Sequence, residues 1–122
     1  MSEYYEADQE YESGTVLIFG GNKEITTTTT LADSRVAGIV STASSFQMNG
    51  DCPGTKVLLA LTGRVPCKFI GTISKGDMVC TSSTPGYACR ADNPAFGTII
   101  GKSLVDKTTL EPGVIEVAVG RL

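Results

Sequence analysis

The residues of this sequence that could do chemistry are four cysteines (Cys52, Cys67, Cys80 and Cys89), together with scattered carboxylates and lysines. No two cysteines form the close Cys-x-x-Cys pair that structural zinc sites usually contain, and the chain has no histidine. The spacing leaves free thiols, disulfides and a metal site open as alternatives. We expect free thiols, because the N-terminal residues lack the pattern of a secretory signal peptide.

Catalytic motifs are weak in this chain. Histidine is the commonest general base and a common metal ligand, and it is absent. Residues 101–103 look like the end of a phosphate-binding loop, but Phe96 stands where that loop needs a glycine. Asp51 and Asp77 have the chemistry of acids or cation ligands, and both are more simply explained as turn-stabilising residues. We therefore expect a protein that is no enzyme and needs no cofactor or metal.

The charge is unevenly distributed along the chain. Residues 1–12 carry five acids and no base, whereas the remainder carries eight acids (13 − 5) and ten bases, so the net charge of −3 comes from the N-terminal segment. The bases are scattered and form no run, which argues against a nucleic-acid partner. No apolar run is long enough to cross a bilayer, so we expect no membrane insertion.

The elements that position these residues are expected to be short strands. β-Branched stretches alternate with Gly and Pro turns, which is typical of an all-β fold. We predict a small barrel or sandwich of about nine short strands, and we see no internal repeat. The expected strands cover residues 14–19, 24–30, 35–42, 56–61, 64–70, 78–81, 87–90, 97–105 and 114–119.

Two local signals refine this prediction. Pro66 cannot donate a ladder hydrogen bond, so its strand is expected at an edge or a bulge. Pro85 and Gly86 are expected at the centre of a type II turn. Residues 1–13 are acidic and rich in tyrosine, and we predict that they form a lead-in segment. Residues 14–122 are then a single β domain.

The irregular stretch over residues 43–55 is unusually long for a compact domain, which makes it a candidate functional loop. It and a second loop combine polar side chains with an aromatic ring, a combination that suits contact with a glycan. An alternative is that Phe46 and Phe96 are interface or core residues. The candidate receptor-binding residues are Phe46, Gln47, Asn49, Asn93 and Phe96.

An ordered set of short motifs resembles the C-terminal domain of phage tail fibres and other phage structural proteins. The similarity is greatest to tail fibres of Acinetobacter phages with contractile tails, and it covers nearly the whole chain. No catalytic residue carries over with this resemblance. The motifs lie at residues 3–6, 14–19, 36–42, 62–68, 73–79, 84–88, 97–102 and 113–120.

The resemblance implies a homotrimeric tip domain of a tail fibre, located in the virion and assembled in the host cytoplasm. The lead-in segment would then arrive from a longer fibre shaft. The implied partners are further copies of the chain and a host-surface polysaccharide or other receptor. A purely structural trimerisation or capping domain is the alternative, and a self-processing or depolymerising enzyme is the remote one.

Overall fold

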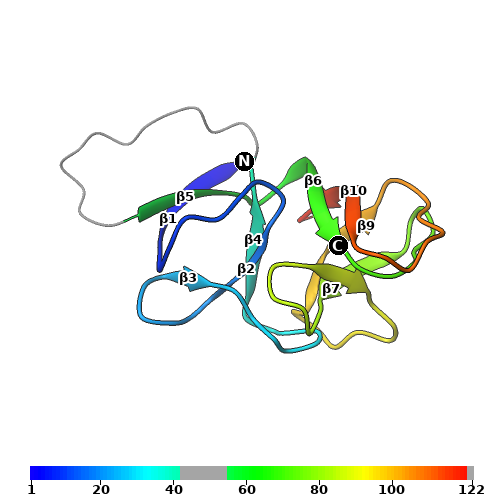
Figure 1. Ribbon diagram of the computed structural model, residues 1–122, viewed down its shortest axis with the longest axis horizontal. Coiled ribbons are helices and arrows are strands. Elements are labelled where there is room, and N and C mark those ends of the chain that lie inside the picture. Colours follow the sequence, from blue (N-terminus) through cyan, green and yellow to red (C-terminus); the bar gives the residue numbers. More distant parts are fainter. Residues whose placement is uncertain (42–54, 121–122) are drawn as a thin grey trace.

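The computed structural model describes residues 1–41 and 55–120, which form ten β-strands and no helix. Five strands lie on each side of the molecule (Figure 1). The first five are β1 (Ser2–Ala7), β2 (Val16–Phe19), β3 (Ile25–Thr26), β4 (Val36–Val40) and β5 (Thr55–Ala60). The last five are β6 (Gly63–Phe69), β7 (Met78–Thr81), β8 (Ala88–Arg90), β9 (Ile99–Ser103) and β10 (Gly113–Val119).

Strand pairing closes each set of five into a barrel. The order around the first barrel is β1-β3-β2-β4-β5, and the order around the second, read from β6, is β6-β8-β7-β9-β10. The pairs β1–β3 and β6–β8 are parallel and the others are antiparallel. The two barrels therefore share one topology. The all-β class is confirmed, but the expectation of no repeat is wrong, because the repeat lies in the strand order.

The repeat extends to single residues. Leu17 pairs with Gly38 in the first barrel, Val79 pairs with Gly101 in the second, and in both the register shifts directly after this pair. We call residues related in this way counterparts. The turn before β2 repeats as well: the N–H of Gly14 donates to the carbonyl of Val40 at 2.9 Å, as that of Gly76 does to Ser103 at 2.8 Å.

Gly38 and Gly101 have a steric role that explains why glycine stands at both positions. A Cβ on Gly38 would lie 2.8 Å from the carbonyl oxygen of Ala60, and one on Gly101 would lie 2.1 Å from that of Ala118. Both oxygens belong to the backbone of the neighbouring strand, which cannot move aside without opening the barrel. The absence of a side chain therefore permits β4 and β9 to approach their partners.

We predict that Gly101→Ala destabilises the fold by about 2 kcal/mol or more, because overpacking against backbone forces the strands apart. Gly113→Ala is the matched control, since its added Cβ would meet only the Lys107 side chain, at 3.1 Å from Cε, and no backbone atom. Urea denaturation of both variants measures the difference. Equal midpoints for the two variants would contradict the close approach of β9 and β10.

The N-terminal segment differs from its expected role. The sequence placed residues 1–13 in a lead-in, whereas residues 2–7 form β1 and pair with β5 along its whole length. Burial increases along β1, from the exposed Ser2 and Glu3 through half-buried residues to the buried Ala7, which bridges to Ile25 of β3. The first barrel therefore includes this acidic strand.

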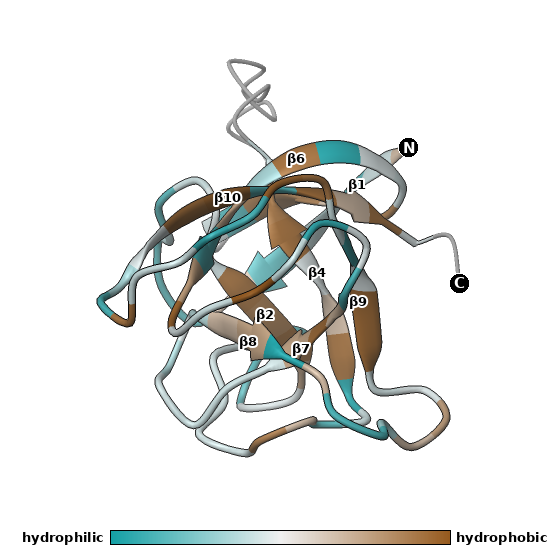
Figure 2. Cartoon of the chain, turned by 90° about the vertical axis from the view of Figure 1, so that its right-hand side faces the viewer, coloured by the Kyte–Doolittle hydropathy of each residue, from teal (hydrophilic) through white to brown (hydrophobic). Residues whose placement is uncertain are grey.

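Each barrel encloses its own apolar interior. Figure 2 shows β2 and β10 coloured mostly as hydrophobic, and both contribute to the buried clusters. The interior positions are counterparts: Leu17 and Val79 occupy one of them, and Leu59 and Val117 occupy another. The first interior contains Ala7, Leu17, Ile25, Val40, Val57 and Leu59.

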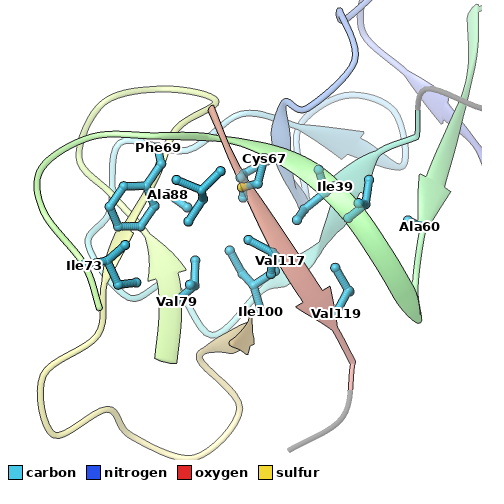
Figure 3. Packing of buried hydrophobic residues seen from close by; sticks show 13 residues of the cluster. Ile39, Ala60, Cys67, Phe69, Ile73, Val79, Ala88, Ile100, Val117 and Val119 are labelled. Carbon is cyan, nitrogen blue, oxygen red and sulfur yellow. The ribbon is translucent and has the colours of Figure 1, made fainter. Parts of the chain in front are cut away.

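The two barrels are joined by packing as well as by the chain. Val16, Ile39 and Ala60 of the first barrel belong to the buried cluster of the second. Figure 3 shows Ile39 and Ala60 on the side of this cluster that faces the first barrel. The remaining members are Val65, Cys67, Phe69, Ile73, Val79, Ala88, Ile100, Ile115, Val117 and Val119.

This junction is possible because the second barrel has an open seam. Strands β6 and β8 pair only at Phe69 and Ala88. At the residues that precede this bridge, the N–H of Lys68 donates to the carbonyl of Gly14, and the N–H of Val16 donates to the carbonyl of Gly86, both at 2.9 Å. The beginning of β2 thus fills the gap that the second barrel leaves in its own wall.

Pro66 lies on this same seam. Alternate residues of a strand point their N–H groups to the same side, so the nitrogen of Pro66 faces the seam as Lys68 does. Strand β10 pairs along the other side of β6 over its full length. The prediction that Pro66 occupies an edge position is confirmed, and its missing N–H costs no ladder hydrogen bond.

Asp33 secures the other end of the junction. Its N–H donates to the Thr81 hydroxyl of the second barrel at 2.7 Å, and that hydroxyl donates to the carbonyl of Thr30 at 2.8 Å. The carboxylate accepts hydrogen bonds from Arg35, at 2.9 Å to Nη2, and from the Thr28 hydroxyl at 2.7 Å. The hydrogen bonds from Arg35 outweigh the effect of burial and lower the pKa of Asp33 from 3.8 to about 2.

We predict a stability contribution from Asp33 that depends on pH. A carboxyl whose pKa falls on folding stabilises the native state fully above its unfolded pKa of 3.8, and this contribution is lost as pH falls towards about 2. The gap in unfolding midpoint between the native chain and Asp33→Asn should therefore be largest above pH 4 and narrow towards pH 2. Asp92→Asn, at an exposed ion pair, is the control and should change little. A gap independent of pH would contradict this role.

Candidate functional site

A depression of about 510 Å³ on the second barrel is the candidate site. Strands β7, β8 and β9 and the turn before β7 form its walls, so residues distant in sequence meet there. The lining residues are Gly76, Asp77, Met78, Arg90, Ala91, Asp92 and Lys102.

The turn before β7 is held as the sequence predicts. Gly76 has a φ of +92°, a left-handed conformation that favours glycine. Asp77 accepts a hydrogen bond from the Ser74 N–H at 3.1 Å, so its carboxylate stabilises the turn. The turn interpretation of Asp77 is thus confirmed, and that of Asp51 lies outside the described residues. The type II turn is also confirmed, since Gly86 has a φ of +82° and the Tyr87 N–H donates to Thr84 at 3.1 Å.

The electrostatic character of the depression is mixed. Arg90 and Asp92 form an ion pair with 3.2 Å between Nε and Oδ1. The exposed Lys102 lies on β9, on the other side of β7. Met78 adds a partly exposed apolar side chain, with 37% of its surface accessible. Such a surface offers donors, acceptors and a small apolar contact, which suits a polar partner such as a sugar or another protein surface.

The predicted receptor-binding residues divide into two groups. Asn93 and Phe96 lie in the exposed loop between β8 and β9, which follows directly on the lining residue Asp92. Asn93 has a φ of +48°, which asparagine tolerates better than most residues, and Phe96 is fully exposed. Phe46, Gln47 and Asn49 lie outside the described residues. Of the predicted residues that the structure describes, both therefore lie in one loop beside the depression.

Sequence reasoning missed the residues of the depression. Arg90, Asp92 and Lys102 are separate charges in the sequence, and no spacing rule links them. They meet because β8 and β9 both pair with β7, one on either side. The one signal in the sequence was the short spacing from Arg90 to Asp92 at a strand end, which carries little information by itself.

The described cysteines are free thiols, as predicted. Cys67 is buried in the second barrel, and this burial raises the pKa of its thiol to about 12. Cys80 and Cys89 are partners across β7 and β8, with 3.9 Å between their sulfur atoms. The hydrogen bond between the two thiols lowers the pKa of Cys80 and raises that of Cys89. Cys52 lies outside the described residues.

We predict that Cys80 and Cys89 form an intramolecular disulfide when the folded chain is treated with glutathione disulfide. The thiolate of one cysteine attacks the reagent, and the second thiol displaces glutathione from the mixed disulfide, so two molecules of reduced glutathione leave. Intact-mass measurement should show the loss of two hydrogen atoms. Cys89→Ser is the control, and the same loss in that variant would assign the disulfide to another pair.

In the described part of the chain, no helix is long and apolar enough to cross a membrane. Residues 1–41 and 55–120 also contain no cluster of three or more cysteine or carboxylate side chains arranged to hold a metal ion. A scan against models of known protein families and a search of curated protein sequences gave no match to this chain.

Proposed function

We propose that this protein is a non-enzymatic structural module of a phage virion, the tip domain of a tail fibre. It assembles with copies of itself into a homotrimer and contacts a polysaccharide or other receptor on the host surface. The ordered set of sequence motifs supports the tail-fibre assignment. The double barrel supports it in physical terms, because closed barrels leave few strand edges exposed and so limit aggregation through those edges.

The observation that carries this proposal is the set of large apolar side chains on the surface. Phe96 is 103% exposed in its loop, which is unfavourable unless a partner covers the ring. The polar depression lies beside that loop, so an apolar anchor and a hydrogen-bonding surface occur together. Interfaces commonly combine an aromatic anchor with a polar rim. The exposed apolar residues are Met1, Phe19, Leu31, Met78, Phe96, Leu110 and Val114.

Receptor contact draws on the same chemistry. Side-chain amides such as Asn93, together with the charges of the depression, hydrogen-bond readily to sugar hydroxyls. Each such contact is weak, and display of three copies on one fibre raises the effective concentration for the second and third contacts. Assembly and receptor binding are therefore two parts of one function.

A purely structural trimerisation or capping domain is the second candidate. The observation that favours it is the same exposed Phe96 ring, which a neighbouring copy would cover as well as a glycan would. The two candidates differ in whether the chain binds cells.

The test is competition for adsorption. We expect the folded chain, added in excess, to reduce attachment of the phage that carries it to host cells, because it occupies the receptor. The heat-unfolded chain is the control. Absence of competition, with the chain folded and assembled, would leave the structural candidate. Release of oligosaccharide from purified host capsule would overturn both in favour of an enzyme.

A further inference from the structure

The repeated topology allows the junction inside the chain to be compared with surfaces that have no partner. The first barrel presents a docking face to the second, consisting of residues 14–16 with Ala32, Asp33 and Ile39. Gly14, Asp33 and Ile39 are all buried there. The second barrel has the same face, formed by the counterparts of these residues, and nothing within residues 1–41 and 55–120 covers it. These counterparts are Gly76, Asp77, Met78, Ala95, Phe96 and Lys102.

At each position, the residue of the first docking face is more buried than its counterpart in the second. Val16 is 1% exposed and its counterpart Met78 is 37% exposed. Ile39 is buried and its counterpart Lys102 is exposed. Most of the second docking face coincides with the depression described above. The candidate site is therefore the place where, in the first barrel, a neighbouring barrel sits.

The seam that receives a docking face is also present twice. In the second barrel it includes Lys68, whose N–H donates to the carbonyl of Gly14 in the docking face. The counterpart in the first barrel is Glu6, because Glu6 and Lys68 directly precede the residues of the parallel bridges. The Glu6 N–H donates instead to the exposed Glu24 carboxylate at 2.7 Å. A side chain of the same barrel thus occupies the place that a neighbouring carbonyl takes in the second seam.

Two exposed aromatic rings fall at matching positions. Thr81 ends β7 and contacts Asp33 across the junction, and its counterpart at the end of β2 is Phe19. Asp33 stands at the same distance before β4 as Phe96 does before β9. A junction built from the seam of the first barrel and the docking face of the second would therefore bring Phe96 against Phe19. Phe19 is 44% exposed and is held edge-on by Tyr5, with 5.4 Å between the ring centroids.

The charges at the seam of the first barrel and at the docking face of the second are complementary. Ile39 and Val65 belong to one apolar cluster across the junction. Their counterparts, by the pairing of β4 with β5 and of β1 with β5, are Lys102 and Glu3, which carry opposite charges. In the contact between copies, opposite charges would thus stand at the positions that buried apolar residues occupy in the internal junction.

We propose that copies of this chain bind head to tail, with the docking face of the second barrel of one copy inserted into the seam of the first barrel of the next. The contact between copies repeats the junction inside each chain, with Phe96 of one copy packed on Phe19 of its neighbour. This inference rests on the self-assembly in the proposed function and names the surfaces that carry it. Such a heterologous contact closes into a ring when its rotation allows.

The test uses the full chain and three variants: Phe96→Ser, Phe19→Ser and, as a matched control, Leu110→Ser, which removes a side chain that is 78% exposed outside both surfaces. Light scattering during size-exclusion chromatography, over a concentration series, gives the dissociation constant. We expect Phe96→Ser and Phe19→Ser each to raise it at least tenfold and Leu110→Ser to leave it unchanged. Unchanged thermal unfolding of the three variants, measured by circular dichroism at a concentration where all chains are dissociated, verifies that they fold.

Mixing the two defective variants gives a signature of head-to-tail binding. A copy with Phe19→Ser still carries Phe96, and a copy with Phe96→Ser still carries Phe19, so the mixture can form one intact contact. We expect a mixed dimer of one copy of each, which native mass spectrometry identifies, and no larger assembly. An interface in which each surface meets its own copy would give no such rescue.

Two outcomes overturn the proposal in different ways. An assembly whose mass is unaffected by Phe19→Ser and Phe96→Ser would overturn the head-to-tail contact and leave the proposed homotrimer standing on other surfaces. A chain that stays monomeric up to about 100 μM, where even weak specific contacts form, would overturn both the contact and self-assembly. The adsorption competition then decides receptor binding independently, because it does not require the copies to associate.

Discussion

The insertion of the beginning of β2 into the seam between β6 and β8 is the contact on which the two-barrel arrangement depends. The second barrel pairs β6 with β8 at a single bridge, so its wall would expose backbone donors and apolar interior without a neighbour. Residues 14–16 supply the missing acceptors and donors, and Val16 completes the interior. The second core is thus formed by both halves of the chain, and we infer that the halves fold as one cooperative unit.

The same strand order is filled with different side chains in the two barrels, which explains what the sequence could and could not predict. Short strands, the type II turn at Pro85 and the edge position of Pro66 follow from local chemistry, and they were predicted correctly. The repeat was missed because a barrel interior requires apolar volume and tolerates many residue types. Counterparts are the same residue where the backbone leaves room for one residue type alone, as at Gly38 and Gly101, where a Cβ would meet backbone. The other identical counterparts, such as Gly14 with Gly76 and Ala32 with Ala95, are small residues and too few to reveal a repeat.

The candidate site shows a similar limit. The sequence singled out Phe96 because an aromatic ring in a polar loop is unusual, and the ring is fully exposed. It could not single out Lys102, because a lysine in a strand is ordinary until its counterpart proves to be the buried Ile39. The information lies in the comparison of two positions that only the topology relates. Asn93 remains a predicted receptor contact, since nothing in the junction requires it.

Three of the exposed apolar residues, Phe19, Met78 and Phe96, have one interpretation once the repeat is known. A unit repeated twice in one chain has one internal junction, so one docking face and one seam take no part in that junction. At these surfaces Lys102 and Glu3 stand at the counterparts of buried apolar residues, and Phe19 and Phe96 stand at the counterparts of Thr81 and Asp33. A surface of this kind favours weak, reversible contact between single copies and strong contact when several contacts form together. That balance suits the proposed function, in which several copies are aligned on a shared fibre.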